Sequence, residues 1–271
     1  MKITTPPIPK EHGAWFMLLV PLTLGTAIAP VRHGRVVVFL ITALSFFLMR
    51  YPLATLIRTR RRPTANRTTL RRWAAFYGSL SLLGGGWLVL AHGLVWLVAI
   101  GGLGGLLLLF YLALVARRRE MTAYGELAGI VGLALGAPMA YYTASGRLDT
   151  TAAVLGLINV LYFGGSVFYI KLKVRQQPRL PAPDRIGERL VKAKACLAYQ
   201  TAVLTIVLVL VALQQAPLLT PLAFLPMTFK MLYGAWRWQD RRSLNLVRLG
   251  VAEIIHSLTF AVLVILAFRG P

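Results

Sequence analysis

Cysteine is nearly absent from the sequence, which has one, Cys196, among 271 residues. A single thiol excludes a disulfide within the chain and any metal cluster built from several cysteines. Because Cys196 lies beside an apolar run, we expect an ordinary packed thiol there.

Acidic residues, and charged residues as a whole, are also scarce. Eight Asp and Glu stand against 30 Lys and Arg, a formal net charge of +22, yet charged residues make up only 14% of the chain. Hydrophobic residues reach 57%, and the mean hydropathy is +0.67. This composition excludes a soluble globular fold. The basic residues form short clusters between apolar runs, which argues against nucleic-acid binding.

The motifs of soluble enzymes are missing too. The sequence has no P-loop, no GxGxxG after a strand and no Ser-His-Asp order. It therefore gives no reason to expect a cofactor.

Long apolar runs dominate what is present. A helix needs roughly 20 apolar residues to cross a bilayer core, and nine segments come near that length: 13–30, 34–50, 73–91, 93–115, 122–144, 150–170, 196–214, 217–235 and 248–268. Each is apolar on all sides, as expected for a helix surrounded by lipid or protein. We therefore predict an all-α, polytopic membrane bundle of about nine transmembrane helices, forming a single domain over residues 1–271.

Glycine and proline mark particular places in these segments. Glycine lets helix backbones approach closely in lipid, so we expect tight packing at Gly84–Gly86 and between Gly101 and Gly105. Pro21 and Pro138 predict local kinks. The first segment resembles a secretory signal, but three prolines and an acid precede it and its apolar stretch is long, so we expect a retained helix.

Lys and Arg are distributed unevenly between the loops. With a cytoplasmic N-terminus, all but four of the 30 fall on the cytoplasmic side; the exceptions are Arg32, Arg35, Arg147 and Arg269. By the positive-inside rule, this distribution predicts a protein of the cytoplasmic membrane with its N-terminus inside and its C-terminus outside.

Two long basic loops stand out, at about 51–72 and 171–195, after the second and sixth segments. One interpretation is that they face anionic lipid headgroups, at about 1 kcal/mol per basic residue. The other is a cytoplasmic anion site, because arginine presents rigid forks that suit phosphate oxygens.

Ionisable residues also occur within or at the ends of the apolar segments, and all fall at the cytoplasmic depth. Charges at this depth cost a few kcal/mol and usually line a wet cavity or pair inside the protein. We therefore predict a polar pocket open to the cytoplasm. Its expected members are Glu126 and His12 as acid–base or orienting groups, Arg50, Arg58, Lys171 and Lys173 as anion-binding groups, and Glu11, Glu253 and His256 as further lining residues.

Glu253 and His256 have a second interpretation. They share a helix face, and Glu-x-x-His is a di-iron ligand pattern when it occurs twice with two further carboxylates. It occurs once here, so the sequence predicts no metal site, although binding of a metal by this pair remains an alternative.

The segment Lys10-Glu11-His12-Gly13-Ala14-Trp15, continuing to Pro21, resembles the signature of the YwiC-like family of bacterial integral membrane proteins. Weaker resemblances follow at Arg50-Tyr51-Pro52, Glu126-Leu127-Ala128-Gly129 and Phe168-Tyr169-Ile170-Lys171. That family has no established biochemical role, so the resemblance implies a membrane protein and no particular activity.

The layout is also similar, more distantly, to the UbiA superfamily of intramembrane prenyltransferases. That resemblance implies nine helices and an active site in the loops after helices two and six. The Asp-rich motifs that hold Mg²⁺ there are missing, because Arg50 to Arg62 and Lys171 to Pro183 contain no acid. Hard Mg²⁺ ions would lack ligands, although Arg and Lys can stabilise a diphosphate directly.

Three functions fit these observations. The leading one is a pocket that binds an anionic isoprenoid or lipid, with prenyltransferase-like chemistry as one use of it. The second is a transporter in which Glu126, Glu253 and His256 relay protons or ions. The third is a non-catalytic membrane assembly partner. Whether the protein is an enzyme stays open.

Overall fold

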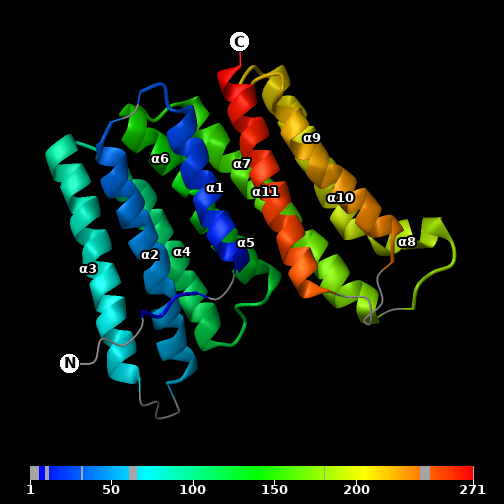
Figure 1. The fold of residues 1–271 in the computed structure, drawn as a ribbon, viewed down its shortest axis with the longest axis horizontal. Coiled ribbons are helices and arrows are strands. Elements are labelled where there is room, and N and C mark those ends of the chain that lie inside the picture. Colours follow the sequence, from blue (N-terminus) through cyan, green and yellow to red (C-terminus); the bar gives the residue numbers. More distant parts are fainter. Residues whose placement is uncertain are drawn as a thin grey trace. The chain divides into compact units, whose positions relative to one another are not determined.

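The computed structural model describes residues 6–9, 12–31, 33–60, 66–179, 181–238 and 245–270. Every regular element in this part of the chain is a helix. The chain divides into two compact units, residues 1–156 and 157–271, and each is described by itself. Figure 1 shows the helices coloured along the sequence.

The first unit contains six complete helices and the start of a seventh. They are α1 (His12–Ile28), α2 (Arg35–Arg58), α3 (Arg67–His92), α4 (Trp96–Ala116), α5 (Ala123–Ala134), α6 (Gly136–Ser145) and the beginning of α7 (Thr150–Ile170). A tight turn joins α3 to α4, where Gly93 has a left-handed φ of 65° that favours glycine.

Two close helix pairs hold this unit together, α1 with α6 and α2 with α3. At Gly25 of α1, an added Cβ would lie 2.8 Å from Ala140 Cβ and 2.9 Å from the backbone nitrogen of Tyr141, both in α6. At Gly84 of α3, it would overlap the Thr42 hydroxyl of α2. The prediction of close helix packing is therefore confirmed at Gly84.

The fifth apolar segment is a helix pair broken next to its proline. α5 ends at Ala134 and α6 begins at Gly136. Pro138 has no backbone N–H to donate to the carbonyl four residues earlier, which belongs to Ala134, so the ladder weakens where the break occurs. At Pro21, by contrast, α1 continues without a break.

The second unit takes the rest of α7 and the C-terminal elements. α7 leads into a π-helical segment η1 (Lys171–Gln176) and a 3₁₀ turn η2 (Gln177–Arg179). Then follow α8 (Ile186–Lys192), α9 (Lys194–Ala212), the 3₁₀ segment η3 (Thr220–Phe224), α10 (Leu225–Trp236) and α11 (Leu246–Arg269).

Aromatic rings fill the centre of the second unit. Tyr162 of α7 stacks on Phe260 of α11 with ring centroids 3.9 Å apart and planes at 14°. Phe224 packs edge-on against both rings. All three side chains are almost fully buried, so this cluster joins α7, η3 and α11.

The protein is a multi-pass, all-α membrane protein, as the composition predicts. Seven helical segments are long and apolar enough to cross a membrane. The helix α1 is shorter, and its apolar part is Gly13–Ile28. The eighth predicted segment, 217–235, is divided between η3 and α10. Each predicted segment is therefore mostly helical within the described residues, although the first is short and the fifth and eighth are each divided between two elements.

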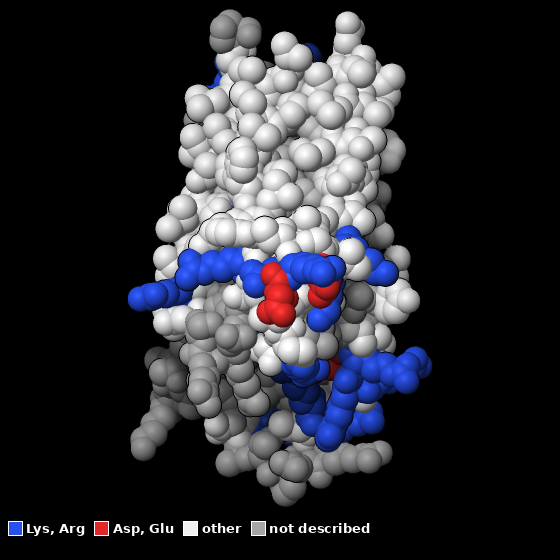
Figure 2. Space-filling model, turned by 90° about the vertical axis from the view of Figure 1, so that its right-hand side faces the viewer, with Lys and Arg blue, Asp and Glu red and all other residues white. Residues whose placement is uncertain are grey.

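The two basic segments are more helical than loops would be. α2 extends through Arg58 and α3 starts at Arg67, while η1, η2 and α8 occupy much of 171–195. Arginine has good helix propensity, and a basic residue in the last turn of a helix complements its dipole. On the face seen in Figure 2, Lys and Arg gather in the lower part, and the upper part is almost entirely uncharged.

Replacing Gly25 by Ala tests the α1–α6 contact. We expect a marked fall in the unfolding temperature of the detergent-purified protein, because the backbone of α6 has no room for the methyl group, and overpacking of this kind costs about 1–3 kcal/mol or more. Gly13→Ala in the same helix is the control, since no atom lies within 4 Å of its Cβ position. Equal unfolding temperatures for the two variants would contradict the described packing.

Candidate functional site

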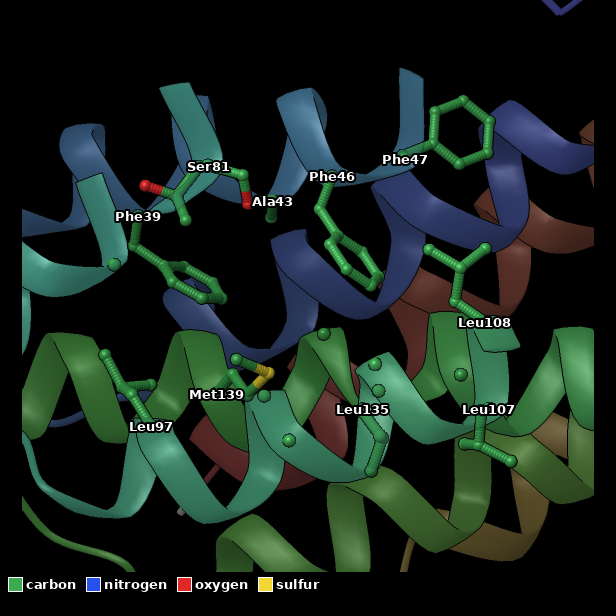
Figure 3. Close-up of a pocket in the computed structure, with 18 of the residues that line it drawn as sticks. Phe39, Ala43, Phe46, Phe47, Ser81, Leu97, Leu107, Leu108, Leu135 and Met139 are labelled. Atoms are coloured by element: carbon green, nitrogen blue, oxygen red, sulfur yellow. The ribbon is translucent and has the colours of Figure 1, made fainter. Parts of the chain in front are cut away.

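The first unit contains an apolar pocket of about 710 Å³, within the usual range for small-molecule sites. Its walls come from α2 to α6, with Leu18 contributed by α1. Figure 3 shows Phe39 and Phe46 of α2 pointing into the space that Leu135 and Met139 border from the other side. The lining is almost wholly hydrocarbon and suits an apolar molecule or tail.

Glycines create much of this space. The pocket is lined by Gly85, Gly86, Gly101, Gly102, Gly104, Gly105, Gly129, Gly132 and Gly136. At Gly86, Gly102, Gly105 and Gly129, no atom lies within 4 Å of the position a Cβ would take. The prediction that glycines bring helix backbones together is therefore wrong at Gly86, Gly102 and Gly105, where the missing side chains leave open volume instead.

Among the described residues that line the pocket, one is charged, Arg50. Its guanidinium carbon lies 5.5 Å from the ring centroid of Phe47 and 5.3 Å from that of Tyr111, within the range of cation–π attraction. Arg50 is the lining residue of α2 nearest to that helix's C-terminus, and Tyr111 is the one nearest to the C-terminus of α4. The pocket therefore has one cationic, aromatic end and a long apolar body.

The pocket also opens sideways, between α3 and α4. Three lining residues are strongly exposed, namely Leu82 at 78%, Leu90 at 89% and Val98 at 63%. Side chains this apolar and this exposed face lipid in a membrane protein. A molecule dissolved in the bilayer can therefore enter without first passing through water.

The predicted acid–base group Glu126 lies near the cationic end. It is in the first turn of α5, one turn before the lining residue Gly129 and on the same side of the helix. A carboxylate there also interacts favourably with the helix dipole. Glu11 lies outside the described residues, as does the side chain of His12, so their predicted roles stay predictions.

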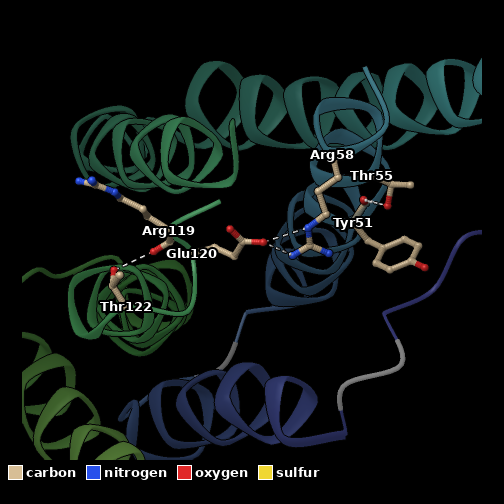
Figure 4. A network of polar contacts seen from close by, with 6 residues as sticks. All are labelled: Tyr51, Thr55, Arg58, Arg119, Glu120 and Thr122. Carbon is tan, nitrogen blue, oxygen red and sulfur yellow. Dashed lines mark hydrogen bonds and ion pairs between the residues drawn. The ribbon is translucent and has the colours of Figure 1, made fainter. Parts of the chain in front are cut away.

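Arg58, the second predicted anion-binding residue, makes an ion pair beyond the pocket. Its Nε donates to Oε1 of Glu120 over 3.1 Å, and the pair ties the C-terminal turn of α2 to the segment between α4 and α5 (Figure 4). The same segment is shaped by Thr122, whose hydroxyl donates to the Arg119 carbonyl and caps α5. Glu120 was not foreseen as a partner, because a contact across 62 residues leaves no local sequence signal.

The remaining predicted residues belong to the second unit, where Glu253 is paired. Lys230 Nζ of α10 lies 2.8 Å from Oε1 of Glu253 on α11, and the two side chains are only 5% and 13% exposed. The ammonium also lies 4.7 Å from the ring centroid of Tyr169. Pairing inside the protein is one of the two outcomes expected for charges at this depth.

Lys173 is buried and makes three hydrogen bonds. Its Nζ donates to Gln177 Oε1 over 3.0 Å, to the Gly234 carbonyl over 2.9 Å and to the Arg237 carbonyl over 2.7 Å. Gly234 and Arg237 lie at the C-terminus of α10, where the helix dipole is negative. This geometry gives Lys173 a structural role in holding α10 to η1, and its predicted role in anion binding stays a prediction.

His256 and Lys171 lie on either side of this cluster in sequence. His256 Nδ1 is 2.7 Å from the Ala252 carbonyl oxygen, which requires a proton on Nδ1. Lys171 begins the π-helical segment. Within the described residues, no three side chains of His, Cys, Asp and Glu gather closely enough to hold a metal ion.

Comparisons with known proteins fit the membrane fold. Residues 8–141 match the model of a family described as YwiC-like protein. A Bacillus subtilis (strain 168) protein described as "Uncharacterized protein YwiC" is 28% identical over 177 residues, which cover 63% of this chain and 68% of the relative. No solved structure matches the chain, and the UbiA-like layout stays a prediction.

The family match includes the whole pocket. It runs from the segment before α1 into α6, and every lining residue falls between Leu18 and Met139. The signature at Lys10–Trp15, the family match and the relative agree, and together they support the YwiC-like family for this chain.

Proposed function

We propose that the first unit binds an amphiphile with an anionic head and a long apolar tail, such as an isoprenoid phosphate or an anionic lipid. The observation that carries this proposal is the pocket itself, an apolar cavity of about 710 Å³ with Arg50 at one end. A tail fits the hydrocarbon walls, and a phosphate or carboxylate head suits the guanidinium.

The contacts of Arg50 support an anionic head. The rings of Phe47 and Tyr111 lie against the guanidinium group, and such contacts engage its flat face. The N–H groups point along its edge, in a fork that matches phosphate oxygens. A site of this kind can hold cation–π contacts and an anion at once. Because an apolar cavity holds little water, the attraction between the guanidinium and an anionic head is stronger there than at a protein surface.

The length of the pocket supports a chain-like tail. Its lining residues extend from Phe39 to Arg50 on α2 and from Leu97 to Tyr111 on α4. At 1.5 Å per residue, these stretches span about 16 to 21 Å, more than half of the roughly 30 Å hydrocarbon core. Each buried methylene contributes about 0.8 kcal/mol, so a long tail supplies most of the affinity and the head supplies selectivity.

A transferase use of this site is part of the proposal. Glu126, one turn before the lining residue Gly129, would act as acid–base or orienting group, together with His12. Without Asp-rich motifs, such chemistry would stabilise the leaving group by Arg and Lys instead of Mg²⁺.

The orientation proposed for the chain places the cationic end of the pocket toward the cytoplasm. Arg58 ends α2, Arg67 begins α3, and Arg60 and Arg117–Arg119 lie in the α2–α3 and α4–α5 connections. Arg35 begins α2 at its other end, and Arg147 lies between α6 and α7. We place the protein in the cytoplasmic membrane, where its basic connections face anionic headgroups.

Ligand binding can be measured as thermal stabilisation of the purified protein by geranylgeranyl diphosphate. We expect the unfolding temperature to rise with this probe, less with phosphatidylglycerol and least with uncharged geranylgeraniol. Arg50→Ala should remove most of the difference between the charged and uncharged probes, because it removes the cation. Arg72→Ala, an exposed residue of α3 that does not line the pocket, is the control. Equal stabilisation of wild type and Arg50→Ala would rule out the site.

Filling the pocket is a second test. Gly105→Leu and Gly129→Leu place a side chain in open volume, so both variants should fold and lose at least tenfold in affinity for the same probe. Gly250→Leu in α11, which also has open space around its Cβ position, is the matched control and should bind as wild type does. Unchanged affinity in both pocket variants would contradict a tail in this cavity.

Topology is tested with reporters fused after residue 271. The proposed orientation predicts an active alkaline phosphatase fusion and a dark green fluorescent protein fusion, because both report an external C-terminus. The reverse pattern would overturn the orientation.

A further inference from the structure

Polar side chains follow one face of α7 and of its continuation through η1 and η2 in the interior of the second unit. They are Asn159, Tyr162, Ser166, Tyr169, Lys173 and Gln177, at spacings of three or four residues, and all are buried. Residues at this spacing share a helix face. From Asn159 to Gln177 the row is about 27 Å long at 1.5 Å per residue, close to the thickness of a bilayer core. We call this row the α7 polar face.

An ion pair lies against the middle of the α7 polar face. Lys230 of α10 contacts both Glu253 and the ring of Tyr169. The Glu253 carboxylate also interacts electrostatically with the phenol groups of Tyr162 and Tyr169. The other titratable groups near the pair are Cys196 of α9, Lys173 of η1 and, one turn further along α11, His256.

Among the described residues, Ser166 Oγ on the α7 polar face and Thr220 Oγ1 on η3 make no hydrogen bond, and each residue is at most 2% exposed. The Tyr162 hydroxyl interacts with Ser257 of α11. A buried polar group without a partner costs about 1–3 kcal/mol, and hydrocarbon offers no replacement. A purely structural Lys–Glu pair does not need such neighbours. Groups of this kind are the partners that buried water or a moving proton requires.

From these observations we propose that the second unit conducts protons across the membrane, with Glu253 as the group that takes up and releases the proton. On one side, Glu253 gains a proton from water and becomes a neutral acid. It then gives that proton to water held by the hydroxyls of Tyr162 and Ser166. Only O–H and N–H bonds form and break, and the net change is one proton moved.

The pairing of Glu253 with Lys230 is compatible with this exchange. Burial penalises both the ammonium and the carboxylate. Moving one proton along the 2.8 Å hydrogen bond from Nζ to Oε1 removes both charges. The ionised and the neutral pair are therefore much closer in free energy here than they are in water. When Glu253 takes up a proton from water, the pair carries one net positive charge, on Lys230, until Glu253 releases that proton again.

The aromatic cluster supplies the barrier that such a pathway needs. Phe260 lies two turns beyond Glu253 on α11 and stacks on Tyr162, and Phe224 packs against both. Thr220 lies one turn from Phe224, on the side away from α10. In the proposed pathway, the cluster lies between Thr220 and the ion pair. It restricts passage to a proton relayed through the Tyr162 hydroxyl and excludes a continuous water column.

The test uses the full-length protein in liposomes that contain the pH-sensitive dye pyranine. A potassium gradient with valinomycin drives proton entry. We expect wild-type protein to acidify the interior at least fivefold faster than empty liposomes. Glu253→Gln should return the rate to the empty-liposome level, and Phe260→Ala should raise it above wild type. Glu188→Gln, an exposed acid in α8, is the control and should conduct normally.

A double variant protects the test against misfolding. Lys230→Met with Glu253→Met removes both charges together and leaves no unpaired ion, so the protein is expected to fold. This variant should elute as wild type does in size-exclusion chromatography and show no proton conduction. Conduction at the wild-type rate in the double variant would overturn the proposal. So would a wild-type rate equal to that of empty liposomes, which would leave the pair a structural contact.

Discussion

The high cost of an unsatisfied polar group in hydrocarbon governs this protein. Within the described residues, it forces the segments that cross the membrane into helices, because a helix bonds its own N–H and C=O groups. It also requires a local partner for every charged side chain that lies deep. Three solutions occur here: Arg50 on two aromatic rings, Lys230 on Glu253, and Lys173 on the carbonyls that end α10. Each solution pins one helix to another, so the charges also determine the packing.

The open volume of the pocket in the first unit comes from glycines, which have no side chain to fill it. Helix interiors normally disfavour glycine by about 1 kcal/mol relative to alanine. The α1–α6 pair needs Gly25 for contact, whereas the pocket uses Gly102 and Gly105 for space. Glycine therefore has two opposite uses within one bundle, and only the surrounding helices distinguish them.

The sequence predicts the class of this fold well and its contacts poorly. The apolar runs and the Pro138 break follow from chain-local physics, since a helix in lipid depends on length and hydropathy alone. The ion pairs Arg58–Glu120 and Lys230–Glu253 join distant residues and depend on tertiary packing. The predicted pocket residues fall in two units, Arg50 and Glu126 in one and Glu253 and His256 in the other. Their common pocket is still a prediction.

The opening between α3 and α4 changes how the affinity of the pocket must be expressed. A ligand that enters from the bilayer equilibrates with lipid and not with the aqueous phase, so its mole fraction in the membrane sets occupancy. A modest intrinsic preference over bulk lipid then suffices to fill the site wherever the amphiphile is abundant. Detergent micelles also dissolve the ligand and dilute it. A site that is occupied in the cell can therefore lose its ligand during purification alone.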